Sequence, residues 1–331
     1  MLRSSFYGLL ILLMAGCGPN EKRLEVDISG VNIPEVKIHR YDLDLFRFNM
    51  ANLQVELEAL KPRYRFFLGT DLSAPEKLTA MRAYLENPRN LDFHRAIKQK
   101  FSDLTPLEHS LTDAFKHFRY YYPNEPIPRL YSYVSGGDYD YPVQFSDSVM
   151  IIGLDNYLGA DFSAYTADGL PLFRVNRMTP GHILPDCMKV LADITIPKTM
   201  PGDNLLEQMV ESGKRLYFVD AMIPATGDRF KIGYSQEQYD WILKHEQHVW
   251  AAIIENRMLY TTDGQLIRAF MADGPFTAEF SRESPARLGE WIGWQIVRRY
   301  MANNDEVTLP ALLAEKDAQK ILTLSKYKPE K

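Results

Sequence analysis

The spacing of apolar residues changes twice along this chain, and that change constrains the fold more than any other feature of the sequence. The first third repeats apolar side chains at the three-to-four-residue interval of amphipathic helices, over 53–67, 75–85, 91–101 and 107–121. The middle carries two short runs typical of buried strands, 129–134 and 148–154, which we expect to pair antiparallel. Helical spacing then returns, over 185–194, 204–218, 235–257, 284–300 and 309–324. The sequence therefore predicts an α+β fold, mostly α-helical, with a small antiparallel or mixed sheet.

Three local signals refine these helices. Pro62 lies inside the first one and should kink or break it, because proline lacks the amide that the helix needs. Asp203 or Asn204 can cap one helix, and Ser235 can cap another, with Glu237 and Gln238 behind it in a capping-box-like arrangement. Gly289 and Gly293 lie four apart on one side of a helix, where glycine is costly, so we expect another helix backbone to approach there.

The extreme N-terminus predicts export and lipidation. A short basic start precedes the apolar run 6–14, which is too short to span a bilayer, and Ala15, Gly16 and Cys17 follow. This order is typical of a lipoprotein signal peptide over 1–16, with the Cys17 thiol as the attachment point for lipid such as palmitate. Residues 17–30 are then a lipidated tether. With no acidic residue directly after Cys17, we expect an outer-membrane anchor that faces the periplasm.

Composition excludes one class of partner and one kind of bond. The chain has 38 Lys and Arg against 43 Asp and Glu, a net charge of -5, which argues against a nucleic-acid partner. Cys187 is the second of two cysteines, so no internal disulfide can form once Cys17 is acylated. We expect Cys187 to be a small buried apolar side chain.

Two histidine groups are the candidate metal ligands. His245 and His248 are three apart on one predicted helix, whereas the zinc-peptidase signature requires histidines four apart. His182 and Asp186 are four apart, but Pro185 lies between them, so they straddle a helix start. For His245 and His248, a solvated polar helix face is a better interpretation than a metal site. Asp186 is better interpreted as a carboxylate near a helix N-terminus, where its negative charge suits the helix dipole. The sequence predicts no catalytic residue, metal or cofactor.

Longer blocks carry a family resemblance across the mature chain. They include residues 38–42, 132–136, 152–159, 231–238, 284–297 and 325–329. Together they are similar to the GldB family of gliding-motility-associated lipoproteins, and the cysteine at position 17 agrees with that resemblance. It implies an envelope lipoprotein whose partners are proteins of the gliding or secretion apparatus.

The family is also similar in helix order to zinc peptidases. In that comparison 185–194 stands for the helix that carries His-Glu-x-x-His, and 205–218 for the helix that carries a glutamate ligand. The chain offers Asp186, Lys189 and Val190 on the first, and Ser212 on the second, with Glu211 one position off. The resemblance therefore implies a peptidase-like scaffold without its metal ligands, a pseudoenzyme.

These arguments predict one globular domain over 31–331, with a helical part at 31–126 and a peptidase-like part at 127–331. We expect a non-catalytic lipoprotein that binds or organises a partner, and the aromatic loop between Tyr131 and Tyr165 is the expected contact surface. The alternative is a metal-dependent envelope hydrolase that uses His245 or His248.

Overall fold

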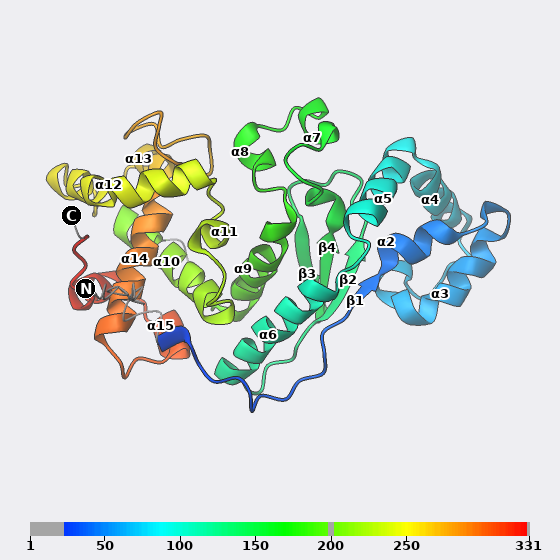
Figure 1. The fold of residues 1–331 in the computed structure, drawn as a ribbon, viewed down its shortest axis with the longest axis horizontal. Helices are drawn as coiled ribbons and strands as arrows, with labels where there is room; N and C mark the ends of the chain where they lie inside the picture. Colours follow the sequence, from blue (N-terminus) through cyan, green and yellow to red (C-terminus); the bar gives the residue numbers. More distant parts are fainter. Residues whose placement is uncertain (1–22, 198–201, 330–331) are drawn as a thin grey trace, which may run out of the picture.

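The structure is a computed structural model that describes residues 23–197 and 202–329. The predicted signal peptide, 1–16, and the predicted lipid attachment at Cys17 lie outside the described residues. Helices dominate and surround one small sheet, which confirms the α+β class. A helical N-terminal lobe, a central sheet and a helical C-terminal lobe follow one another across the molecule (Figure 1).

The central sheet is mixed. Its strands are β1 (Ile38–Arg40), β2 (Arg129–Tyr133), β3 (Val143–Ser146) and β4 (Val149–Gly153), in the order β1-β2-β4-β3. β2 and β4 run parallel, with Leu130 opposite Met150, so the predicted antiparallel pairing of these two segments is wrong. The antiparallel partner of β4 is β3, and a turn at Asp147 and Ser148 joins them, with φ of 49° and 65°. This turn lacks the glycine that usually marks a two-residue hairpin, which is why β3 went unpredicted.

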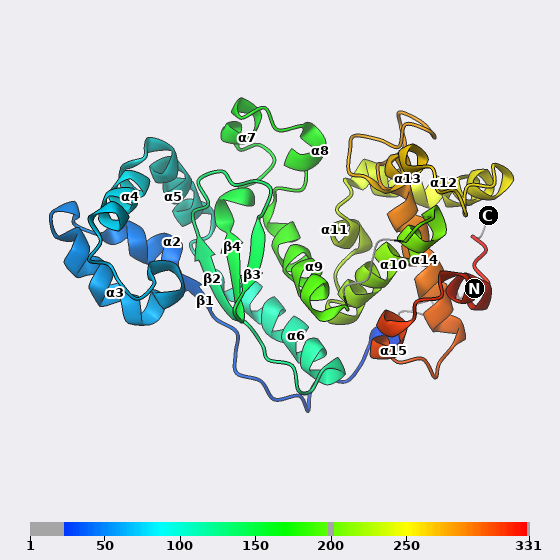
Figure 2. The same cartoon turned by 180° about the vertical axis from the view of Figure 1, so that it is seen from behind.

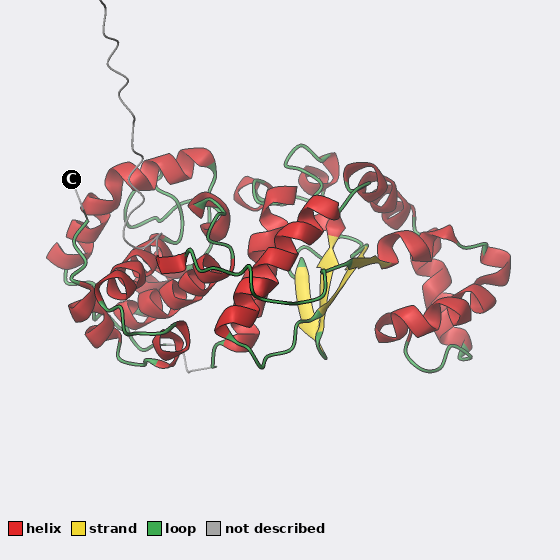
Figure 3. Cartoon of the chain, turned by 60° about the horizontal axis from the view of Figure 1, so that its bottom comes forward, coloured by secondary structure: helices red, strands yellow, loops and turns green. Residues whose placement is uncertain are grey.

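The sheet is covered on both faces. β4, one of its two central strands, is accordingly apolar throughout. Leu130, Met150 and Ile152 pack into the main core with α6 (Thr105–Tyr121) and α9 (Ile183–Thr195). Tyr131 and Ile151 belong to a second core that the N-terminal lobe closes. A strand buried on two faces has no polar alternation, which accounts for the unbroken apolar run that first indicated β4. Figure 3 shows the sheet enclosed between helices.

The N-terminal lobe consists of short helices. They are α2 (Tyr41–Asp44), α3 (Leu53–Leu68), α4 (Pro75–Glu86) and α5 (Pro88–Lys100). Tyr64 leaves helical geometry inside α3, at φ −122° and ψ 33°, two residues after Pro62. The predicted kink is therefore confirmed, and it lets Tyr64 turn into the core of this lobe, where its hydroxyl donates to Asp44.

The remaining helices build the C-terminal lobe and a protrusion above the sheet. They are α7 (Ser163–Ala167), α8 (Leu172–Val175), α10 (Leu205–Met222), α11 (Asp228–Ile232), α12 (Gln236–Glu255), α13 (Gly264–Met271), α14 (Leu288–Asn303), α15 (Leu309–Ala314) and α16 (Ala318–Ser325). The caps predicted at Asn204 and Ser235 are both present. The helix predicted at 284–300 begins instead at Leu288, because the Ser284 hydroxyl bonds to Ser281 and Thr277 in a buried turn.

Helices α10 and α14 cross with their backbones in contact. A Cβ placed on Gly293 would lie 1.8 Å from the Met209 carbonyl oxygen, and one on Gly213 would lie 2.3 Å from the Gly293 carbonyl oxygen. Gly289 would similarly meet the Met271 sulfur at 2.4 Å. The close helix approach predicted from Gly289 and Gly293 is therefore confirmed.

A buried ion cluster braces the same helices. The Asp220 carboxylate on α10 accepts from Lys231 at 2.8 Å, from Trp294 Nε1 at 2.7 Å and from Arg298 Nε at 2.7 Å. Arg298 also pairs with Asp228. Burial would raise the pKa of Asp220, but Arg298 and Lys231 outweigh burial and hold that pKa below its ordinary value. Two carboxylates and two cations compensate one another, which is what buried charges require.

The described chain starts on the C-terminal lobe. The Arg23 guanidinium donates to the carbonyls of Met301, Asn304 and Val307, at the end of α14 and just beyond it. Leu24 is already buried in the main core. The following segment runs along the molecule to β1 (Figure 2). Among the described residues no helix has the length and apolar character needed to cross a membrane.

Candidate functional site

Three adjoining cavities form a groove between the central sheet region and the C-terminal lobe. The first, about 470 Å³, lies beside the loop that follows β2 and includes Tyr139, Phe173 and Asp186. The middle cavity, about 240 Å³, shares Arg177 and Lys189 with the first. The third, about 500 Å³, shares Ser212, Arg215 and Glu290 with the middle one and ends near Pro197 and Gly202. We call the three together the central groove.

Helix α9 forms one wall of the central groove. It buries Ile183, Cys187, Met188, Leu191 and Ala192 in the core. Asp186, Lys189 and Asp193 follow one another at helical spacing on the other side, and they line the groove cavities. Asp186 accepts from Lys189 at 3.1 Å and from the buried Tyr157 hydroxyl at 3.0 Å. The carboxylate is therefore fixed by two donors.

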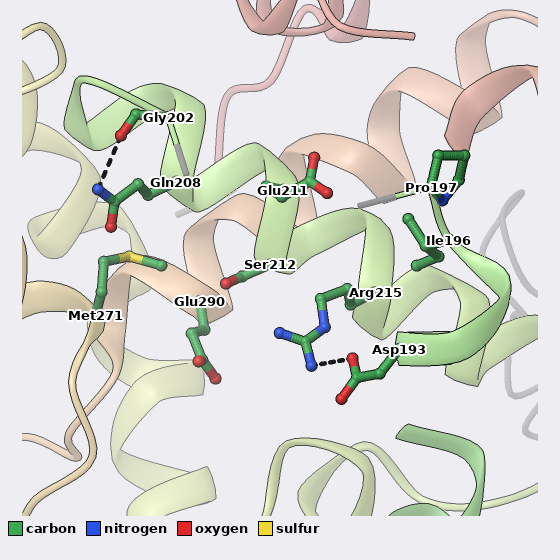
Figure 4. A pocket seen from close by; sticks show the side chains of 10 residues that line it. All are labelled: Asp193, Ile196, Pro197, Gly202, Gln208, Glu211, Ser212, Arg215, Met271 and Glu290. Atoms are coloured by element: carbon green, nitrogen blue, oxygen red, sulfur yellow. Dashed lines mark hydrogen bonds and ion pairs between the residues drawn. The ribbon is translucent and has the colours of Figure 1, made fainter. Parts of the chain in front are cut away.

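Helix α10 forms the facing wall. The side chains of Ser212, Arg215 and Glu290 point toward one another, and Arg215 reaches back to Asp193 on α9 (Figure 4). Glu211 pairs with Lys214 on its own helix at 3.2 Å. Ser212, where the predicted peptidase likeness would place a glutamate ligand, lines two of the cavities.

Arg287 closes the groove from the start of α14. Its backbone is left-handed, with φ 58°, an uncommon conformation for a residue with a side chain. Its guanidinium donates to the Ile232 carbonyl at 2.7 Å and to Glu290 at 3.3 Å. Burial disfavours the charge, yet Glu290 and Asp273 raise the pKa of Arg287 above its ordinary value. Arg177, on the opposite wall, also pairs with Asp273.

His182 and Asp186 have different partners and do not form a common site. His182 lies just before α9, buried, with Nδ1 2.9 Å from the Thr179 hydroxyl. Burial lowers the pKa of His182 to about 4, so its ring is neutral at physiological pH. Within the described residues no hydrogen bond or ion pair joins His182 to Asp186, and its Nε2 has no hydrogen-bond partner. His182 packs against Phe230, with ring centroids 5.3 Å apart.

The other histidine pair lies on α12, away from the central groove. His245 stacks on Trp241 at 4.2 Å and contacts the Trp241 carbonyl at 2.7 Å, while His248 is exposed. Glu246, between them, accepts from Trp291 Nε1 and from the Tyr327 hydroxyl, each at 2.8 Å. This carboxylate therefore ties α12 to α14 and to the C-terminal segment.

The aromatic loop divides into core and surface residues. Tyr131, Tyr157 and Tyr165 are buried, so the expectation that the whole loop forms a contact surface is wrong for them. Tyr139 lines the first cavity, and Tyr141 beside it is 64% exposed. Cys187 is fully buried, as predicted, and burial raises the pKa of its thiol.

The donor set in the central groove does not fit a zinc ion. Zinc requires three or four nitrogen, sulfur or carboxylate ligands around one point. At the positions that the predicted peptidase likeness would assign to ligands the chain has Asp186, Lys189, Val190 and Ser212, and the Asp186 carboxylate is already paired with the Lys189 ammonium group. Across the described ranges no cluster of three His, Cys, Asp or Glu side chains has a metal-binding arrangement.

Comparison with known families identifies the family of this chain. The family model described as gliding motility protein GldB matches residues 21–329. The chain belongs to the GldB family. Membership makes it a gliding-motility lipoprotein of the cell envelope, associated with the gliding apparatus. No curated protein and no solved structure matches it. The likeness to zinc peptidases therefore stays a prediction.

The sequence indicates only part of this groove. Asp186, Lys189 and Ser212 had been singled out, and they do line it. Arg177, Arg215 and Arg287 had not, because they come from three segments more than 30 residues apart with no motif in common. The left-handed backbone of Arg287 gives no signal in the sequence.

Proposed function

We propose that this GldB-family chain is a non-catalytic lipoprotein that binds a protein of the gliding machinery in its central groove. The observation that carries the proposal is the ion pair between Lys189 and Asp186 on α9, opposite Ser212 on α10. On a peptidase-like scaffold these positions would hold the metal ligands. On such a scaffold the Lys189 ammonium group would lie beside the ligand positions and would repel a dication.

A lipid on Cys17 would hold the C-terminal lobe close to the membrane. Arg23, whose side chain is bound to the end of α14, is the sixth residue after Cys17. Even a fully extended segment of that length reaches only about 20 Å. We place the anchor in the outer membrane, with the folded chain on the periplasmic side. A partner of the gliding or secretion apparatus would then be recruited at a short, fixed distance from the lipid surface.

Metal analysis of the purified full chain tests the proposal against a metal-dependent hydrolase. We expect no stoichiometric zinc, and we expect His245→Ala combined with His248→Ala to leave gliding or growth intact. About one zinc per chain, lost in the double variant together with function, would overturn the proposal. Lys189→Gln should weaken recruitment of the partner, because it removes one of the groove cations without changing either histidine.

A further inference from the structure

The middle cavity of the central groove is lined by four cations and one carboxylate. Arg177 precedes α9, Lys189 is on α9, Arg215 is on α10, and Arg287 precedes α14. Glu290 is the single acidic side chain among the lining residues. Four separate segments therefore direct positive charge at about 240 Å³ of space, which we call the cationic cavity.

The acidic partners of three of these cations lie in the adjoining cavities of the central groove. Lys189 pairs with Asp186, Arg215 with Asp193 and Arg177 with Asp273, and none of these three carboxylates lines the cationic cavity. The ion pairs hold the cations in place without filling the space in front of them. Within the cationic cavity itself four cations face one carboxylate, so an anion placed there would be attracted.

Arg287 supplies a second, independent observation. Its side chain is only 12% exposed, yet its Nε has no hydrogen-bond acceptor among the described residues. The nearest carboxylate oxygen, from Asp273, is 3.4 Å away and is not aligned for a hydrogen bond. Its other nitrogens donate to the Ile232 and Gly233 carbonyls and to Glu290, so its positive charge is fixed at the wall of the cationic cavity before any ligand binds.

We propose that the cationic cavity binds a carboxylate from an extended, acidic peptide segment of the protein partner. This inference rests on the proposed function and names the chemistry of the partner. A cavity of this size admits one side chain or chain terminus, not a folded surface. The cavities on either side carry apolar and aromatic groups, with Phe173 and Met178 at one end and Ile196 and Met271 at the other. Residues flanking the acidic one would pack there.

A display library of random seven-residue peptides, selected on the purified full chain in detergent, tests the inference. We expect the selected peptides to share an aspartate or glutamate between apolar residues. Replacing that residue by its amide should weaken binding at least tenfold by calorimetry. Affinity should also fall as salt is raised from 50 to 500 mM, since half-exposed ion pairs are screened.

Lys189→Gln combined with Arg215→Gln should abolish binding of the selected peptides, with an unchanged melting temperature. Arg95→Gln is the matched control, because Arg95 is also a surface cation paired with a carboxylate, Asp92, but lies on α5 outside the groove. Peptides without acidic residues, or peptides that bind the double variant equally, would overturn the inference. Binding of inorganic phosphate in the cavity without any peptide binding would also overturn it. The zinc and histidine tests do not depend on peptide binding, so the two failures can be told apart.

Discussion

Replacing Gly293 by alanine tests how closely α10 and α14 cross. Alanine is the better helix former, and by propensity alone it would stabilise α14 by up to about 1 kcal/mol. The structure predicts the opposite sign. The added Cβ would lie 1.8 Å from the Met209 carbonyl oxygen and 2.3 Å from its carbonyl carbon, and both are backbone atoms that cannot rotate away.

The magnitude follows from the separation that the helices must undergo. Non-bonded carbon and oxygen atoms rest at roughly 3 to 4 Å, so α10 and α14 must move apart by more than about 1 Å. That movement loosens the packing of Trp291 and Trp294, which are both buried on α14. Overpacking of a core typically costs about 1 to 3 kcal/mol, and more when backbone is displaced. We expect a net loss of about 3 kcal/mol, or roughly 4 to 5 °C in melting temperature, since the entropy of unfolding is about 2.1 cal/mol/K per residue.

Thermal unfolding followed by circular dichroism measures this loss. Gly264→Ala is the matched control, because Gly264 also lies in a helix, α13, and its added Cβ would meet only the flexible end of Arg268 at 3.5 Å. We expect the control to melt within 2 °C of the unchanged protein. If Gly293→Ala melts at or above the unchanged protein, the helices do not cross as closely as described.

Three further predictions concern the anchor, the ion cluster and pH. Cys17→Ala should leave an uncleaved precursor without lipid, and unchanged palmitate labelling of that variant would refute the assignment. Asp220→Asn should lower the free energy of unfolding in urea by about 3 to 5 kcal/mol, because it leaves Asp228 as the one carboxylate of the cluster against the positive charges of Lys231 and Arg298; a loss below 1 kcal/mol would contradict the described cluster. The folded pKa of His182, about 4, lies below its ordinary value of 6.5, so the unfolded chain binds the extra proton and stability falls as pH drops through that window. The fall attributable to His182 is up to about 3 kcal/mol and should be absent in His182→Gln; parallel pH profiles of the two proteins would rule it out.

The fold was predictable where the signal is local. Asn204 and Ser235 mark helix starts through their own side chains, and Pro62 kinks α3 through its own ring. The direction of β2 relative to β4 could not be predicted from the sequence. Both strands are buried on two faces, and the same residues would suit a parallel or an antiparallel pair. The turn at Asp147 and Ser148 adopts left-handed backbone without glycine, so it hid β3.

The site was less predictable than the fold for a physical reason. Asp186 and Lys189 lie three apart on one helix, so their shared face could be read from the sequence. Arg287 reaches the groove only because its own backbone is left-handed and because Gly289 and Gly293 let α14 approach α10. The position of Arg287 in the groove therefore depends on how the helices pack, and no local sequence pattern predicts it.

Photocrosslinking from inside the groove tests the central claim most directly. p-Benzoylphenylalanine would replace Phe173 in the first cavity, and Phe66 on α3 in the N-terminal lobe as the control position. In intact cells we predict an adduct with a gliding-apparatus protein from position 173, lost when Lys189→Gln and Arg215→Gln are added. The same adduct from position 66 but not 173, or one that survives loss of both cations, would contradict a groove that binds its partner through these charges.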